Sequence, residues 1–143
     1  IHSLIQFTDG SIKAQLGLPD MKLPIQYALT YPDRLPSDFP RFNFFNYPQF
    51  TFEQADTKTF RNLALAYEAM YKGGNSPCVL NAANEVAVQA FLKDKIGFLE
   101  MSDLIENCLQ TIEYIKKPSY TDYVETDKET RERAKNLLHN YSN

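Results

Sequence analysis

Residues 101–115 read MSDLIENCLQTIEYI, and this stretch decides the fold class of the chain. Its apolar side chains recur at intervals of three and four residues, which is the spacing of one face of an α-helix. The members of this face are Met101, Leu104, Ile105, Cys108, Leu109 and Ile112. Such a stripe is normally buried against other helices. The sequence therefore predicts an amphipathic helix over 101–115 within a helical bundle.

Two helices are predicted before this stretch. The first is expected from Thr57 to Lys72, with Asp56 or Thr57 as its cap and Gly73-Gly74 as its end. Its apolar stripe consists of Phe60, Leu63, Ala64, Tyr67 and Met70. The second is expected to begin at Ser76-Pro77, because serine is a good N-cap and proline fits the first helical position.

A fourth helix is predicted after the stretch. It is expected to begin at Thr126, because Glu129 three residues later completes a capping box. Its apolar residues are Ala134, Leu137, Leu138 and Tyr141. Short connections between the first three helices favour antiparallel neighbours, so we expect a four-helix bundle over residues 56–143.

The first sixteen residues predict a β-hairpin. Asp9-Gly10 suits a two-residue type I′ turn, which would pair Phe7 with Ile12 and Ile5 with Ala14. One apolar face would then collect Ile1, Ile5, Phe7, Ile12, Ala14 and Leu16. Because an isolated hairpin is marginally stable in water, we expect either the rest of this chain or a missing sheet to cover it.

Between the hairpin and the bundle, prolines interrupt every regular pattern. Residues 17–24 predict a loop, and Pro24 can open a short helix that stops near Tyr31. From Pro32 to Ala55 we expect an extended linker, whose many aromatic side chains fasten it to a protein surface. The predicted fold is therefore α+β: residues 1–31 are the remnant of a sheet-containing domain, 32–55 the linker and 56–143 the bundle.

Composition excludes several classes of partner. The net charge is −3 and the basic residues are scattered, which argues against a nucleic-acid partner. No apolar run reaches the roughly 20 residues of a membrane-spanning helix, and no signal-peptide pattern is visible. Cys78 and Cys108 are interpreted as buried thiols in a reducing compartment. Because the sequence opens at Ile1 without a methionine, we expect a fragment or a processed chain.

Local motifs do not reveal a reaction. His2 and His139 lack a metal-ligand partner at helical spacing, and no Gly-rich phosphate loop or nucleophile elbow occurs. Asp127 and Glu129 could meet a hard cation, but we interpret them as first-turn residues that complement a helix dipole. In residues 81–85, NAANE, the two asparagines are expected to be buried amides that tie the bundle together or meet the backbone of the linker, with a ligand contact as the alternative.

Three stretches nevertheless resemble one family, the 1-deoxy-D-xylulose 5-phosphate reductoisomerases of non-mevalonate isoprenoid biosynthesis. They are residues 1–16, residues 18–34 and residues 63–88. The segments Pro19-Asp20-Met21 and LNAANE, residues 80–85, are distinctive in combination. The similarity extends over essentially the whole chain and keeps the same order.

The resemblance implies an oxidoreductase with three domains. An N-terminal domain binds NADPH, a central domain is catalytic, and a helical C-terminal domain follows a long linker. The enzyme rearranges 1-deoxy-D-xylulose 5-phosphate and reduces the intermediate to 2-C-methyl-D-erythritol 4-phosphate, with Mg²⁺, Mn²⁺ or Co²⁺ as a Lewis acid. This chain would correspond to the end of the catalytic domain (1–31), the linker (32–55) and the helical domain (56–143) of a homodimeric enzyme, bacterial and cytoplasmic or plastid.

The resemblance also implies where this chain meets the active site. Pro19 is the candidate contact for substrate and Met21 the candidate contact for the nicotinamide of NADPH, while Lys22 stands where the family often has arginine. No catalytic or metal-binding residue is carried over, so the chain without its missing N-terminal domains is expected to be inactive and to bind neither NADPH nor the cation. The alternatives are a free-standing helical interaction module and a subunit that completes a partner's sheet.

Overall fold

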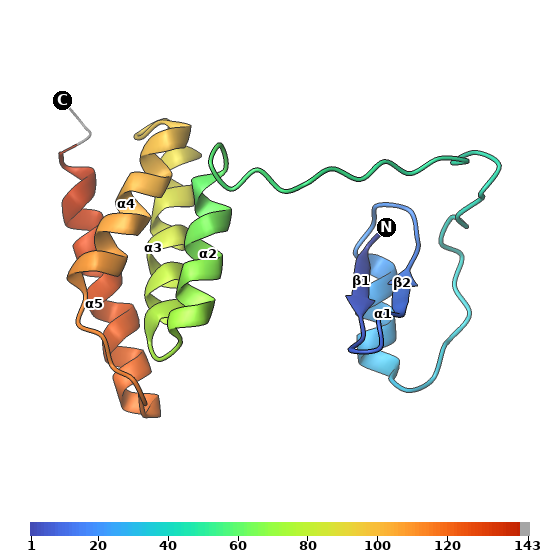
Figure 1. Cartoon of the computed structure of the whole chain (residues 1–143), viewed down its shortest axis with the longest axis horizontal. Helices are drawn as coiled ribbons and strands as arrows, with labels where there is room; N and C mark the ends of the chain where they lie inside the picture. Colours follow the sequence, from blue (N-terminus) through green and yellow to red (C-terminus); the bar gives the residue numbers. More distant parts are fainter. Residues whose placement is uncertain (141–143) are drawn as a thin grey trace. The chain divides into compact units, whose positions relative to one another are not determined.

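The structure, a computed structural model, describes residues 1–140 and separates into two compact units, Ile1–Glu53 and Gln54–Asn143 (Figure 1). The described residues form one two-stranded antiparallel sheet and five helices, so the predicted α+β class is confirmed. The domain boundaries inferred from the sequence stay a prediction. Tyr141, which we expect on the inner side of the last helix, lies outside the described residues.

The first unit opens with the predicted hairpin, but its register differs by one residue. Strand β1 (Ser3–Gln6) pairs with β2 (Ile12–Gln15), placing Leu4 opposite Ala14 and Ile5 opposite Lys13. The predicted pairing of Ile5 with Ala14 is therefore wrong. A one-residue shift moves side chains to the other face of a strand. The apolar residues are consequently divided between the two faces instead of sharing one.

The turn explains this shift. The carbonyl of Phe7 accepts the N–H of Gly10 at 3.0 Å, and only Gly10 in the turn has a positive φ, 87°. This is a three-residue loop in which glycine alone takes the left-handed conformation, whereas a type I′ turn would require it of Asp9 as well. The Asp9 carboxylate instead accepts the N–H and hydroxyl of Ser11 at 2.8 and 2.6 Å.

Helix α1 (Lys22–Thr30) follows the loop and ends before Pro32, as expected. It begins two residues before the predicted Pro24, because the Asp20 carboxylate accepts the N–H of Lys22 at 2.9 Å and fixes the first turn. No helix or strand forms between Tyr31 and Phe60. In this segment Phe42 packs against Phe44, Tyr47 and Phe50, with ring centroids 5.1 to 6.1 Å apart.

The second unit is the predicted four-helix bundle (Figure 1). Its helices are α2 (Arg61–Lys72), α3 (Ser76–Phe91), α4 (Phe98–Thr111) and α5 (Tyr120–Leu138). Helix α3 packs on each of the other three. The stripe predicted over 101–112 lies in the core, where Leu104 and Cys108 are fully buried. Small side chains of α3, including Ala83 and Ala87, let the helices approach closely.

Three helix starts differ from the prediction. Helix α2 begins at Arg61, because the Asp56 carboxylate caps a separate turn by accepting the N–H groups of Lys58 and Thr59. Helix α4 begins at Phe98, where the Glu100 carboxylate accepts the N–H of Gly97 at 2.6 Å.

Helix α5 begins six residues before the predicted Thr126. Ser119 and Asp122 form the capping box at its start: Ser119 Oγ accepts the N–H of Asp122 at 3.2 Å, and Asp122 accepts that of Ser119 at 2.7 Å. Thr126 is instead a buried residue inside the helix. The predicted Thr126–Glu129 box is therefore wrong.

The amide that ties the bundle together is Asn75, which the sequence analysis missed. Its side chain is 1% exposed, accepts the N–H of Ile115 at 2.9 Å and donates to Glu113 O and Thr126 Oγ1. Asn75 thereby joins the turn between α2 and α3 to the connection that precedes α5. We predict this role for Asn81 and Asn84, but Asn84 is only half-buried, and Asn81 is exposed and donates to Glu85.

Candidate functional site

The loop between β2 and α1 borders a groove of about 340 Å³. Pro19 and Met21, the two residues that the resemblance singles out, both lie in this loop and are exposed. The groove is lined by Ile1, His2, Gly17, Leu18, Pro19, Asp20 and Met21. It lies entirely within the first unit, and apolar side chains form most of its lining.

Asp20 fixes the conformation of this loop. Its N–H donates to the carbonyl of Leu18 at 2.8 Å, and its carboxylate accepts the N–H of Lys22 at 2.9 Å. The second carboxylate oxygen lies 3.4 Å from Lys22 Nζ. The hydrogen bond from the Lys22 N–H is the main reason that the pKa of Asp20 lies below its ordinary value. Pro19 and Met21 thus flank Asp20, whose hydrogen bonds to Leu18 and Lys22 fix the loop.

Hairpin pairing brings His2 to the same groove. The N–H of His2 donates to the carbonyl of Gln15 at 3.0 Å, which places the start of the chain beside the loop that follows β2. In the sequence, His2 is a candidate only for metal binding, and it lacks a partner ligand at helical spacing. Its position could be anticipated only from the strand pairing, because no local motif surrounds it.

A second groove, of about 330 Å³, shares the loop residues 17–20 with the first. Its remaining lining comes from Leu16, Leu23 and residues 39–42 of the proline-rich segment. Arg41, at its edge, is engaged with Ser37, because its Nη2 donates to the Ser37 carbonyl at 2.7 Å. The loop that carries Pro19 and Met21 therefore separates two hollows.

The described residues offer few other reactive groups. Across residues 1–140, no three or more His, Cys, Asp or Glu side chains gather in a way that could hold a metal ion. Both cysteines are free. Burial raises the pKa of the Cys108 thiol to about 11 and also raises that of Cys78, so neither is an activated nucleophile. None of the helices in this part of the chain combines the length and apolar character that a membrane crossing requires.

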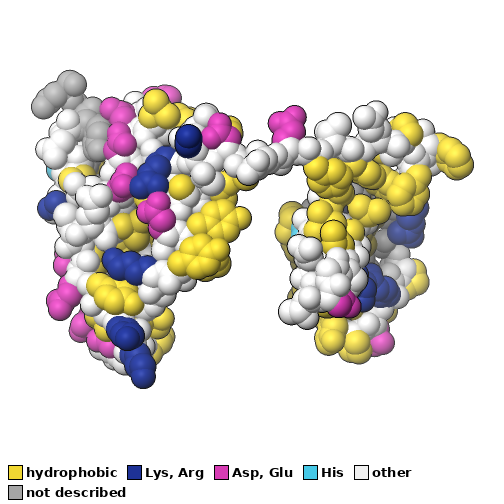
Figure 2. Space-filling model, in the orientation of Figure 1, with side chains coloured by type: hydrophobic (Ala, Val, Ile, Leu, Met, Phe, Trp, Pro, Cys, Tyr) yellow, Lys and Arg dark blue, Asp and Glu magenta, His cyan; other side chains and the backbone are white. Residues whose placement is uncertain are grey.

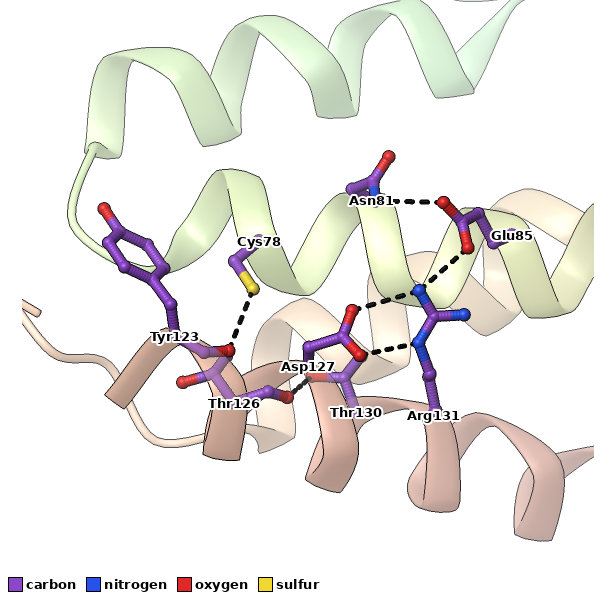
Figure 3. A network of polar contacts seen from close by, with 8 residues as sticks. All are labelled: Cys78, Asn81, Glu85, Tyr123, Thr126, Asp127, Thr130 and Arg131. Carbon is purple, nitrogen blue, oxygen red and sulfur yellow. Dashed lines mark hydrogen bonds and ion pairs between the residues drawn. The ribbon is translucent and has the colours of Figure 1, made fainter. Parts of the chain in front are cut away.

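Helices α3 and α5 are joined by a polar network (Figure 3). Arg131 donates to Asp127 at 2.7 Å and to Glu85 at 2.8 Å, and Asn81 donates to the other oxygen of Glu85 at 3.2 Å. The hydrogen bond from Arg131 is the main cause that lowers the pKa of Glu85. Asp127 is thus an ion-pair partner of Arg131 in the middle of α5, so its interpretation as a first-turn residue is wrong.

This network joins α3 to α5, and its Glu85 and Arg131 also line a hollow of about 600 Å³. Its carboxylates are already paired with Arg131, and the three charged side chains remain between 32% and 53% exposed. Exposed ion pairs of this kind contribute about 1 kcal/mol or less each. The groove at residues 17–21 is lined by both Pro19 and Met21, which the resemblance singles out, so it is the candidate functional site of this chain.

Comparison with known proteins gives the chain a family. The family model described as DXP reductoisomerase C-terminal domain matches residues 16–133. The 1-deoxy-D-xylulose 5-phosphate reductoisomerase of Phocaeicola vulgatus is 62% identical over 138 residues, which are 96% of this chain and 36% of that protein. The Bacteroides fragilis enzyme is 60% identical with the same coverage.

Solved structures show the same relationship. The reductoisomerase from Zymomonas mobilis in complex with NADPH is 41% identical, with a TM-score of 0.83 over 96% of this chain and 36% of that one. A DOX-P reductoisomerase in complex with NADPH, fosmidomycin and magnesium is 33% identical, with a TM-score of 0.85 and the same coverage. This chain spans little more than a third of the length of these relatives. It belongs to the DXP reductoisomerase C-terminal domain family and corresponds to the C-terminal portion of these enzymes.

Proposed function

We propose that this chain is the C-terminal part of an NADPH-dependent 1-deoxy-D-xylulose 5-phosphate reductoisomerase, which forms 2-C-methyl-D-erythritol 4-phosphate. One observation carries the proposal: 96% of the chain aligns at 62% identity with a relative of that name, and the match covers only 36% of the relative. In this proposal the complete enzyme is a homodimer of the bacterial cytoplasm or a plastid, and this chain depends on its N-terminal NADPH-binding and catalytic domains.

The proposal gives each segment a place. Residues 1–31 end the catalytic domain, residues 32–55 form the linker, and residues 56–143 form the helical domain. The open edges of the hairpin support the first assignment, because a two-stranded sheet with exposed faces is typical of part of a larger sheet. The separate buried core of the second unit supports the last.

Pro19 and Met21 would act at the groove. Pro19 would contact the substrate and Met21 the nicotinamide ring of NADPH, which supplies the hydride when bound. Both side chains are exposed on a loop that Asp20 holds in place, so they can face a ligand without rearrangement. Apolar side chains there would exclude water from the reacting atoms. A divalent cation would be held by the rest of the enzyme, since residues 1–140 gather no ligand cluster for it.

The first prediction concerns activity. The purified chain should show no NADPH oxidation that depends on 1-deoxy-D-xylulose 5-phosphate. A fused protein, in which this chain replaces the matched 138 residues of the Phocaeicola vulgatus relative, should oxidise NADPH when substrate and Mg²⁺ are present. NADPH absorbance measures both, with the reaction lacking substrate as the control. Steady turnover by the chain alone, or a folded fused protein without turnover, would contradict the proposal.

The second prediction concerns Met21. In the fused protein, Met21→Ser should lower kcat/KM for NADPH about tenfold, because losing an apolar contact of about 1.4 kcal/mol changes a rate by that factor. Met21→Leu keeps an apolar side chain of similar volume and should stay within about threefold of the unchanged protein. Steady-state kinetics with varied NADPH measures both. Equal kinetics for the serine and leucine variants would remove Met21 from the site.

A further inference from the structure

Helix α2 is apolar on two opposite faces. Leu65 and Ala69 are buried in the bundle. The apolar stripe predicted from the sequence lies on the other side, because a helix turns by about 100° per residue. We call this side the outer face of α2; it consists of Phe60, the residue before the helix, with Leu63, Tyr67, Met70 and Tyr71. Of the stripe predicted along residues 60–70, Ala64 is half-buried and the other members are exposed.

The outer face is well exposed. Its side chains range from 37% exposed at Leu63 to 81% at Tyr71. Figure 2 shows hydrophobic side chains gathered along the α2 side of this unit. The rings of Tyr67 and Tyr71 are stacked, with centroids 6.4 Å apart and planes 20° apart. Contiguous apolar surface of this kind usually marks an interaction site, whereas single exposed apolar residues do not.

Charged residues at both ends of α2 contact the rest of the bundle. Arg61 donates to Glu68 of its own helix and to Glu106 of α4, both at 2.6 Å. At the other end, the ammonium of Lys72 lies 4.9 Å from the ring centroid of Tyr114. These contacts attach α2 to the bundle at both ends. The outer face thus belongs to a helix whose first and last residues both contact other parts of the bundle.

We propose that the outer face of α2 is an interdomain surface, covered by the N-terminal part of the complete enzyme that this chain lacks. This inference rests on the proposed function. A helix that is apolar on opposite sides is typical of one that lies between two layers of protein. Relatives named as reductoisomerases have enough further chain to supply such a second layer, because the region matched here is 36% of their length. Aromatic residues and methionine are also enriched at interfaces.

Methionine oxidation tests this surface directly. Met70 is 57% exposed and lies on the outer face, Met21 is 58% exposed and lies elsewhere, and Met101 is 6% exposed in the core. In the chain alone, peroxide should oxidise Met70 and Met21 at comparable rates and Met101 more slowly, because access governs oxidation. In the fused protein, Met70 should react about tenfold more slowly than in the chain alone, while Met101 should not change. Peptide mass spectrometry gives each rate.

Each outcome has a definite meaning. Equal Met70 rates in the chain and in a cooperatively folded fused protein overturn the inference, whatever the activity of the fused protein. Protection in the chain alone that grows with protein concentration also overturns it, since a second copy would then cover the surface. A fused protein that protects Met70 but does not oxidise NADPH supports the interdomain surface and contradicts the proposed function.

Discussion

Gly74→Ala is expected to lower the free energy of unfolding of the helical unit by about 4 kcal/mol, because it combines overpacking with backbone strain. Gly74 has a φ of 59°, which disfavours any residue with a Cβ. A Cβ at this position would overlap the carbonyl oxygen of Ile115 and lie 2.8 Å from the Tyr114 ring. The carbonyl belongs to the backbone and Asn75 bonds both the N–H and the carbonyl of Ile115, so the obstacle cannot move aside cheaply.

Gly73→Ala is the matched control for this prediction. Its φ is 66°, but a Cβ there would meet nothing within 4 Å. Its ψ of −149° adds to the strain, because this combination of φ and ψ is essentially confined to glycine, so the cost should be about 2 kcal/mol, less than for Gly74→Ala. Urea unfolding followed by circular dichroism compares the two variants with the unchanged chain. If both substitutions lower the free energy of unfolding equally, overlap of the new Cβ with Ile115 adds no cost, which would contradict this prediction.

The same turn shows what the sequence can and cannot predict. The pair Gly73-Gly74 correctly predicts the end of α2. It gives no sign that Gly74 approaches Ile115 or that Asn75 is buried, because both contacts join residues about 40 positions apart. The sequence places buried amides at Asn81 and Asn84, because two asparagines and a glutamate interrupt an apolar helix there. Local composition correctly indicates that a buried asparagine joins the helices. Which asparagine does so depends on long-range contacts.

The helices likewise show which features the sequence predicts and which it leaves open. The pattern over 101–112 predicted α4, because its apolar side chains share one face and that face is buried. For α2, periodicity also identified residues that share a face, but periodicity does not say what covers that face. For α5, two capping boxes are possible between residues 119 and 129. Ser119 with Asp122 forms, and Thr126 with Glu129 does not, because Thr126 lies in the interior of the bundle.

The hairpin could be located from the sequence, but its register could not. An Asp-Gly pair fits both the two-residue turn and the three-residue loop. The loop that forms needs a positive φ at Gly10 alone and lets the Asp9 carboxylate bond Ser11. In the site, Pro19 and Met21 are identified by family resemblance, and their contacts with ligand stay a prediction. His2 reaches the groove only through strand pairing, which the sequence does not specify.

The observed register leaves apolar side chains exposed on the hairpin, and this should make its amides exchange rapidly in the chain alone. Both faces are apolar in part, with Leu4 and Ile12 on one and Ile5 on the other, and all three side chains are about half exposed or more. In described residues, neither strand has a second neighbour. Such a hairpin should open often in the chain alone. Its amides should therefore exchange with solvent within about tenfold of the rates of an unfolded peptide.

In the fused protein, strands supplied by the N-terminal part should pair with these edges and cover both faces. Amides of β1 and β2 should then exchange about a thousandfold more slowly than in the chain alone, since they open only with a larger cooperative unit. Leu104 and Ile105 of α4 are the internal control, because they are buried in the bundle and should be protected in both proteins.

Hydrogen–deuterium exchange of β1 and β2 in these two proteins is the most direct test that this chain is part of a larger enzyme. The account predicts fast exchange in the chain alone and strong protection after fusion, with the α4 amides unchanged. Strong protection of both strands already present in the isolated chain would contradict it, because the hairpin would then be completed without any other polypeptide.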